Sequence, residues 1–182
     1  MSLPQPPRPA KLVIGALLKA RDLFPGLAAE LEAAFGPLDL VSPWFPFDTT
    51  RYYEPEMGAP LWRRVAAFKR LIAQERLAEI KLATNAIEQC RAVDGRRPVN
   101  LDPGYLLLER FVLASGKNYA HRIHVGRGIY ADLTLVFQRG EFRALPWTYP
   151  DYADHPLRRF LSAVRQKYGL DLNAPPEPME TP

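Results

Sequence analysis

The sequence predicts an α+β fold in which a mainly antiparallel sheet packs against two or three helices. Short apolar runs that suit strands alternate with amphipathic stretches that suit helices. Their order is strand, helix, strand, strand, helix, strand, followed by a hairpin and a last helix. This order predicts a ferredoxin-like β-α-β-β-α-β core with a C-terminal β-hairpin and helix added to it.

The first half of the chain supplies a strand, a helix and an extended segment. Residues 11–19 form an apolar run with a lysine at each end, which suits a buried strand. Apolar residues then recur at helical spacing from 27 to 35, before Gly36-Pro37 ends the helix. Residues 38–47 are aromatic and extended, and their two prolines favour an edge strand or a broken one. A polar loop is expected from 48 to 58.

The middle of the chain contains two segments whose patterns fit both a strand and a helix. Residues 61–72 have helical spacing but are interpreted as a strand from 64 to 72. A helix is predicted from Arg76 to Val93, because its apolar residues form one stripe and Asp94-Gly95 ends it. A strand follows from 98 to 102. Residues 106–115 fit either the continuation of that strand or a buried helix.

The last third predicts an antiparallel hairpin and a helix. Residues 121–126 and 128–137 read as strands, and the second alternates well between apolar and polar side chains. Arg139-Gly140 suggests a hairpin turn into a strand at 143–145. Residues 147–154 form an aromatic loop, and residues 157–168 an amphipathic helix.

Composition predicts one globular domain. The chain has 182 residues, 47% of them hydrophobic, and a net charge of +4 that does not demand nucleic acid. One domain is expected from 11 to 172, with Pro-rich flexible tails at 1–10 and 173–182. A single cysteine, no signal peptide and no apolar run of the ~20 residues that a membrane helix needs predict a cytoplasmic protein without a membrane partner.

The stretch from Asn100 to Tyr105 is the strongest candidate for a functional site. On an extended strand, Asn100 and Asp102 point to the same face and hold an amide beside a carboxylate. Pro103-Gly104 then favours a turn. A polar site and a simple strand end are both common uses of this pattern. We expect Asp102 to face Glu88 and the loop at 52–58, and to come within ~5 Å of Glu88 if the two share an ion.

The predicted helix from Arg76 contributes Lys81, Asn85 and Glu88 to this site. Their spacings place them on adjacent turns of one side, beside the apolar stripe. They could reach the rim of a pocket or form a solvent-exposed network along the helix. Cys90 lies on the apolar stripe and is interpreted as a small core residue.

Acidic residues in several segments suggest a divalent metal. Asp48 and Glu56 lie in a loop among hydroxyl and aromatic side chains, and oxygen ligands suit hard cations. With Glu88 and Asp102 they predict a Mg²⁺ or Mn²⁺ site. The spacing is not diagnostic, and surface acids that cap turns are the alternative.

Basic residues follow the turn at 115–118. Lys117, His121 and Arg122 could hold a phosphate or carboxylate and move a proton, although a strand with a solvated basic face is equally consistent. The chain has no P-loop motif, no Gly-x-Gly-x-x-Gly, no His-Glu-x-x-His and no Gly-x-Ser-x-Gly.

These stretches together resemble a family of uncharacterised bacterial and archaeal proteins, the domain of unknown function DUF4416. The resemblance rests on residues 52–58, on residues 80–88, on residues 100–105, and on the motifs at 117–130 and 147–152. It covers nearly the whole chain apart from the tails. It implies no established activity, substrate or cofactor. Members are sometimes described as GTP-binding, which the missing P-loop does not support.

Three hypotheses of function remain open. The first is a cytoplasmic enzyme acting on a phosphorylated small molecule, with or without a divalent metal. The second is a nucleotide-binding (GTP) or RNA-binding protein without a P-loop. The third is a structural or regulatory partner protein, and a homodimer through an exposed sheet edge is an option. The first hypothesis assigns catalysis to Asp102, Glu88 and His121, and substrate binding to Lys81, Asn85, Asn100, Lys117, Arg122 and Tyr53.

Overall fold

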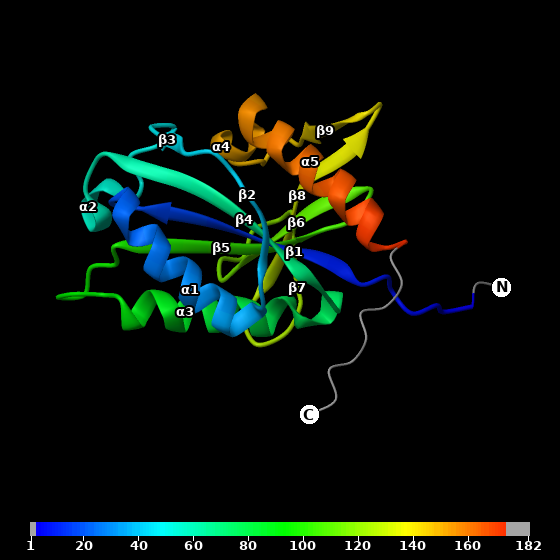
Figure 1. The fold of residues 1–182 in the computed structure, drawn as a ribbon, viewed down its shortest axis with the longest axis horizontal. Helices are drawn as coiled ribbons and strands as arrows, with labels where there is room; N and C mark the ends of the chain where they lie inside the picture. The colour runs from blue at the N-terminus through cyan, green and yellow to red at the C-terminus, as the bar shows by residue number, and fades with distance from the viewer. Residues whose placement is uncertain (1–2, 174–182) are drawn as a thin grey trace.

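Strand β1 (Ala10–Leu18) is the centre of the fold, and all nine of its residues are buried. The computed structural model describes residues 3–173 (Figure 1). On one side β1 pairs antiparallel with β4 (Leu61–Ile72), and on the other with β5 (Val99–Leu106). A strand that pairs on both edges and is covered on both faces needs the apolar run that the sequence shows.

The sheet has nine strands, and every strand pair in it is antiparallel. Its main path runs β2-β4-β1-β5-β6-β8-β7, with β3 beside β4 and β9 beside β8. The part β2-β4-β1-β5 confirms the predicted β-α-β-β-α-β core, and the hairpin extends it. The other strands are β2 (Leu38–Val41), β3 (Phe45–Phe47), β6 (Arg110–Ser115), β7 (Arg122–His124), β8 (Tyr130–Gln138) and β9 (Glu141–Ala144).

Helices cover both faces of this sheet. Helices α1 (Phe24–Phe35) and α3 (Leu77–Cys90) lie side by side, where Arg91 binds Glu30 through two hydrogen bonds (Figure 1). Helix α5 (His155–Asp171) crosses the sheet near β8 and β9. The short helices are α2 (Glu54–Met57) and α4 (Pro150–Ala153), with 3₁₀ turns η1 (Arg21–Leu23) and η2 (Gln74–Arg76).

Two consecutive arginines on β4 identify the two faces of the sheet. The Arg63 guanidinium lies 5.4 Å from the ring of Tyr152, which belongs to α4. The Arg64 guanidinium lies 4.5 Å from the ring of Phe24, which belongs to α1. Successive side chains of a strand point to opposite faces. The face of Arg63 is therefore the one beneath α4 and α5.

Most predicted elements are confirmed, and the two ambiguous segments are strands. Residues 61–72 form β4, and residues 110–115 form β6. The loops expected at 48–58 and 147–154 each contain one helical turn, α2 and α4, both with a proline in the first turn. Proline suits that position because the first turn of a helix needs no backbone N–H donor.

The turn predicted at Pro103-Gly104 is wrong, because both residues continue β5 to Leu106. The backbone N–H and C=O of Leu101 bond to side chains of α3 rather than to β1. In a strand, residues two apart direct their N–H and C=O groups to the same edge, so Pro103 faces the same edge of β5 as Leu101. β6 pairs with β5 only from Gly104 onward. At Pro103 this edge therefore has no neighbouring strand to which a backbone N–H would donate.

Gly104 is required for a different reason. A Cβ at this position would lie 2.4 Å from the backbone oxygen of Val112 on β6. The glycine therefore permits close approach of two strands.

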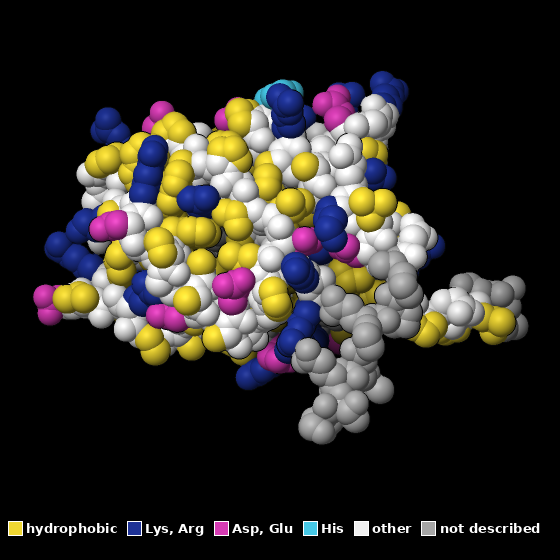
Figure 2. Space-filling model, in the orientation of Figure 1, with side chains coloured by type: hydrophobic (Ala, Val, Ile, Leu, Met, Phe, Trp, Pro, Cys, Tyr) yellow, Lys and Arg dark blue, Asp and Glu magenta, His cyan; other side chains and the backbone are white. Residues whose placement is uncertain are grey.

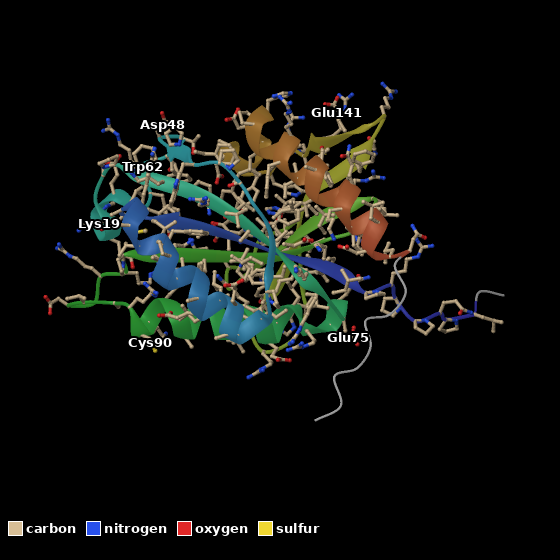
Figure 3. The ribbon with its side chains drawn as sticks, in the orientation of Figure 1. Lys19, Asp48, Trp62, Glu75, Cys90 and Glu141 are labelled. Carbon is tan, nitrogen blue, oxygen red and sulfur yellow. The ribbon has the colours of Figure 1, made fainter. Side chains whose placement is uncertain are left out.

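Cys90 is exposed, so the prediction of a core residue is wrong. Figure 3 shows it at the far end of α3, away from the sheet. Leu77, Ile80 and Thr84 of the predicted stripe are buried, but Lys81 and Glu88 are buried beside them. The buried side of α3 is therefore partly charged and does not extend to Cys90.

The tails are described only in part. Residues 174–182 of the predicted C-terminal tail lie outside the described residues. At the N-terminus, Gln74 donates to the carbonyl of Arg8 at 2.9 Å, and the Tyr168 hydroxyl donates to that of Pro9 at 2.7 Å. The last residues of the predicted N-terminal tail therefore contact the fold.

The surface carries both signs of charge. Figure 2 shows Lys and Arg side chains interspersed with Asp and Glu on the face that it displays. Within residues 3–173, no helix has the length and apolar character needed to cross a membrane.

Candidate functional site

A cavity of about 750 Å³ lies on the face of the sheet that carries Arg63. We call it the central cavity. Its size is within the range of small-molecule sites. Side chains from strands β3 to β8, from helices α3 and α4 and from the loops that connect these elements converge on it. It is lined by Phe47, Thr49, Thr50, Tyr52, Tyr53, Arg63, Lys81, Asn85, Arg97, Asn100, Asp102, Leu113, Ala114, Ser115, Gly116, Lys117, Tyr119, Arg122, Asp132, Tyr149, Pro150, Asp151 and Tyr152.

Strand register explains why these residues meet. Asp102 lies opposite Gly15 on β1, and Leu113 on β6 lies opposite both Gly104 and Asp132. Residues that are opposite one another in an antiparallel pair share a face. Arg63, Asp102, Leu113, Arg122 and Asp132 therefore belong to one face, which the loops at 48–53 and 149–152 border.

Asp102 and Asn100 form the centre of the cavity floor, as the sequence predicted. The Asn100 amide donates to Asp102 Oδ1 at 3.0 Å, which confirms that the two side chains share a face. Arg63 donates to Asp102 Oδ2 at 2.7 Å and to Asp151 at 3.0 Å. The Arg63 side chain is only 4% exposed, so this arginine neutralises two carboxylates inside the protein.

Asp102 remains ionised in this environment. Burial alone would raise the pKa of this carboxyl, but the charges of Arg63 and Lys81 and hydrogen bonds from Arg63 and Asn100 outweigh it. The net result is a pKa below the usual value for aspartate. Such a carboxylate is a strong hydrogen-bond acceptor and a weak general base.

Lys81 and Glu88 are buried because together they complete the edge of β5. Lys81 Nζ donates to the Leu101 carbonyl at 2.7 Å, and the Leu101 N–H donates to Glu88 Oε1 at 2.6 Å. Two side chains of α3 thus replace the strand that is missing beside Leu101. Of the two alternatives for these helix residues, the solvent-exposed network is therefore wrong for Lys81 and Glu88, since both are buried and bond to backbone groups that need partners.

Replacing Glu88 tests this role. Burial raises the pKa of Glu88 against the opposing effects of Lys81, the Leu101 N–H and Arg97, so we expect its acceptor oxygen to matter more than its charge. Glu88→Leu leaves the Leu101 N–H unpaired and should cost about 1–3 kcal/mol of unfolding free energy. Glu88→Gln keeps an acceptor and should retain most of that stability in urea unfolding.

The matched control is Glu79→Leu in the same helix, where the side chain is 56% exposed and pairs with Arg76. Its effect should stay within about 1 kcal/mol. Equal losses in Glu88→Leu and Glu88→Gln would contradict the assigned role.

The acids predicted to bind a metal are held apart by arginines. Arg97 binds both oxygens of Glu56, at 2.6 and 2.9 Å, and its Nη1 donates to Glu88. Asp102 reaches this group through Asn100, whose amide oxygen lies 3.4 Å from Arg97. Asp48 is exposed beyond β3 (Figure 3).

Among residues 3–173, no group of three or more His, Cys, Asp or Glu side chains is placed to hold a metal ion. The predicted Mg²⁺ or Mn²⁺ ligands do not assemble, because each of the three more central acids is bonded to an arginine. The residues present do not fit a divalent metal.

The turn at 115–122 supplies the basic side of the cavity. Lys117 Nζ donates to the Tyr52 hydroxyl at 2.6 Å and lies 4.3 Å from the centre of its ring. Arg122 donates to Asp132 at 2.8 Å, to the Lys117 carbonyl at 3.0 Å and to the Tyr149 hydroxyl at 2.9 Å. Arg122 is thus occupied in holding the turn, whereas the Lys117 ammonium has a neutral partner.

His121 does not line the cavity. Its ring stacks between Tyr119 and Trp147, at centroid distances of 5.9 and 5.0 Å. Its Nε2 atom lies 3.4 Å from an oxygen of Asp132, which Arg122 also binds. The predicted catalytic histidine therefore packs between two aromatic rings next to the turn at 115–122 and does not line the cavity.

Tyrosine hydroxyls complete the lining. Tyr152 is 1% exposed, and its hydroxyl has no hydrogen-bond partner among the described residues. A Cβ on Gly15 would lie 2.2 Å from that hydroxyl, so the glycine makes room for it. Burial, followed by the Asp102 charge, raises the pKa of Tyr53, and burial also raises that of Tyr152. Both remain protonated at neutral pH.

Some of these residues could not be recognised from sequence patterns. The missed members are Gly15, Arg63, Arg97, Asp151 and Tyr152. One signal was present: Arg63 interrupts an apolar strand, and an arginine is rarely buried without a partner. Its partner Asp102 is 39 residues away, so sequence spacing did not reveal the pair.

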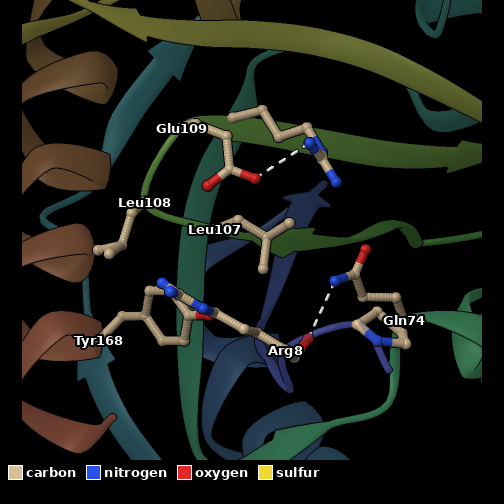
Figure 4. Close-up of a pocket in the computed structure, with 8 residues that line it drawn as sticks. Arg8, Gln74, Leu107, Leu108, Glu109 and Tyr168 are labelled. Atoms are coloured by element: carbon tan, nitrogen blue, oxygen red, sulfur yellow. Dashed lines mark hydrogen bonds and ion pairs between the residues drawn. The ribbon is translucent and has the colours of Figure 1, made fainter. Parts of the chain in front are cut away.

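A smaller cavity of about 280 Å³ lies between the N-terminal segment and α5 (Figure 4). Arg8, Gln74, Glu109 and Tyr168 line it with neighbouring residues. Figure 4 shows Gln74 bonded to the Arg8 carbonyl and Glu109 paired with an arginine. Its volume is near the lower limit for a ligand site, so the central cavity is the better candidate.

Comparisons with known proteins identify the family and no activity. Neither a curated protein nor a solved structure matches this chain. The model of the domain of unknown function DUF4416 matches residues 8–168, which include every residue that lines the central cavity. Since that match covers most of the chain, the protein belongs to the DUF4416 family.

Proposed function

We propose that the protein binds a phosphate-containing small molecule in the central cavity, as the substrate of an enzyme or as a bound effector. The observation that carries this proposal is the position of Lys117. Its ammonium lines the cavity and, among residues 3–173, makes no ion pair with a carboxylate. An unneutralised cation beside several hydroxyl donors is suited to the oxygens of a phosphate.

Exposed tyrosines favour a nucleotide within this class. Tyr52, Tyr119 and Tyr149 are 63%, 55% and 45% exposed, and all three line the cavity near Lys117. Aromatic side chains beside basic groups stack on nucleobases without needing a P-loop. RNA is the second candidate that this observation supports, and its binding would weaken steeply with salt.

The cavity is better suited to binding than to acid–base catalysis. An ionised Asp102 with a lowered pKa is better suited to accept hydrogen bonds than to remove a proton at neutral pH. Glu88 is engaged at Leu101 and Arg97, and His121 lies outside the cavity lining. If the protein is an enzyme, its cavity contributes mainly by positioning and by charge stabilisation.

A thermal-shift screen tests the proposal. Nucleoside monophosphates and sugar phosphates should raise the unfolding midpoint, because a ligand that binds only the native state stabilises it. Since the acids do not assemble into a metal site, the shift should be the same with and without Mg²⁺ or Mn²⁺. The absence of any shift with all phosphate compounds would remove the proposal.

Replacing Tyr52 makes a sharper prediction. The Tyr52 hydroxyl occupies one of the three N–H donors of Lys117, and we expect this bond to hold the ammonium back from a bound phosphate. Tyr52→Phe removes this bond and keeps the ring, and should tighten phosphate binding about threefold to tenfold in isothermal titration calorimetry. Tyr149→Phe is the matched control, because its hydroxyl bonds to Arg122 instead. Weaker binding in Tyr52→Phe would show that the hydroxyl itself contacts the ligand.

A further inference from the structure

The charges around the central cavity are unevenly neutralised, and this limits the kinds of ligand that fit. Four of the five cationic residues in the lining already bond to protein acceptors that are charged or belong to the backbone. Arg63, Arg97 and Arg122 bind carboxylates, and Lys81 binds a carbonyl. Lys117 donates to a neutral hydroxyl and is exposed, whereas Lys81, whose carbonyl partner is also uncharged, is buried. The cavity therefore offers one place for an anionic group, at one end.

The floor offers the opposite chemistry. Asp102 accepts one hydrogen bond on each oxygen, from Asn100 and from Arg63, and a carboxylate has about four acceptor positions. Its side chain is 23% exposed on the cavity side. Asn85 also lines the cavity, and its amide makes no hydrogen bond within residues 3–173. A ligand group that donates hydrogen bonds would find unused acceptors here.

The cation and the acceptors lie on different segments of the cavity wall. Asp102 lies on β5, and Lys117 follows β6 on the side toward β8 and β7. β5 and β6 are neighbours, and extending their register places Asp102 beside Ser115, with Lys117 two residues farther along the chain, so the two backbones are separated by on the order of 8 Å. Inorganic phosphate at Lys117 makes no favourable contact with the Asp102 carboxylate, because both are anions, whereas a phosphorylated compound with a hydroxyl or amino donor can contact both.

We infer that the central cavity selects phosphate monoesters that carry hydroxyl or amino donors at the end remote from the phosphate. The phosphate binds Lys117, and the donors bind Asp102 and Asn85. This inference rests on the proposed function and adds to it the polarity of the ligand and its direction in the cavity. Sugar phosphates and amino-bearing nucleotides share this chemistry.

The assignment is tested by calorimetric titration of the full chain with inorganic phosphate, ribose 5-phosphate and adenosine 5′-monophosphate. Lys117→Met should weaken all three about tenfold or more, because each loses its anion partner. Asn85→Leu should leave inorganic phosphate unchanged and weaken at least one of the two esters about fivefold to tenfold. The ester that responds identifies whether sugar hydroxyls or a base amino group occupies the floor.

Asn85 is the primary variant because the described structure gives its amide no structural bond to lose. Asp102→Asn is the second variant, used where thermal unfolding shows that it remains folded, and it should change the esters in the same direction. Equal effects of Asn85→Leu on inorganic phosphate and on both esters, or no effect on either ester, would overturn the inference. Failure of the proposed function is distinct from this, since no compound would then bind the unmodified protein.

Discussion

Arg63→Met should destabilise the protein by about 3–5 kcal/mol, because it leaves the partly buried carboxylates of Asp102 and Asp151 without their cation. Arg63 is 3% exposed and binds both Asp102 and Asp151. Methionine fills much of the same volume, so the loss reports the charge more than the packing. Urea unfolding at pH 7 measures it. Lys69→Met on the exposed part of β4 is the matched control and should stay within about 0.5 kcal/mol.

The same variant should have an altered pH dependence. In the unmodified protein, the pKa of Asp102 in the folded state is below its unfolded value of about 3.9, so the ionised carboxylate stabilises the folded state above that pH. This stabilisation is lost as pH falls through the folded pKa. Without Arg63, burial is opposed only by the Lys81 charge and the Asn100 hydrogen bond, so we expect the Asp102 pKa to rise above the unfolded value. The Arg63→Met variant then has a lower unfolding free energy at neutral pH, and this loss becomes smaller as pH falls.

The difference in unfolding free energy between the two proteins should therefore narrow from pH 7 toward about pH 4. Asp102→Asn in the Arg63→Met background should recover part of the loss at pH 7, because the unpaired charge is removed. A gap that stays constant with pH would show that Asp102 is not the group left unpaired.

Local sequence patterns were sufficient to predict the sheet and the pair of Asn100 and Asp102 on the floor of the central cavity. The order of apolar runs predicted the β-α-β-β-α-β core, and the two-residue period predicted that Asn100 and Asp102 share a face. Both inferences depend on backbone geometry that every strand shares. They did not require knowledge of which strands are neighbours.

The partners of charged residues could not be inferred in the same way. Glu88 and Asp102 were expected to form one acidic pair, but Arg97 and Arg63 neutralise them separately. The pairing depends on which strands are adjacent, and Arg63 reaches Asp102 across β1 only because Gly15 has no side chain between them. Similarly, Pro103-Gly104 has the composition of a turn, yet the edge of β5 accommodates the missing N–H.

Lys11→Met is the other substitution with a large expected effect, and it tests the opposite end of β1. Lys11 is fully buried, and its ammonium binds Asp39 at 2.5 Å and Asp171 at 2.6 Å. It therefore joins β1 to the strand β2 and to the end of α5. Removing it leaves two carboxylates together, with Lys167 as their remaining cation, and should cost about 3–5 kcal/mol in urea unfolding at pH 7.

Lys19→Met is the matched control, because Lys19 follows the same strand and is exposed. It should change stability by less than about 0.5 kcal/mol. Replacing both acids in the Lys11→Met background, with Asp39→Asn and Asp171→Asn, should restore much of the loss, since a buried network of uncharged groups avoids the unpaired charge. If the triple variant is less stable than Lys11→Met alone, hydrogen-bond geometry rather than charge holds this end of the sheet to α5.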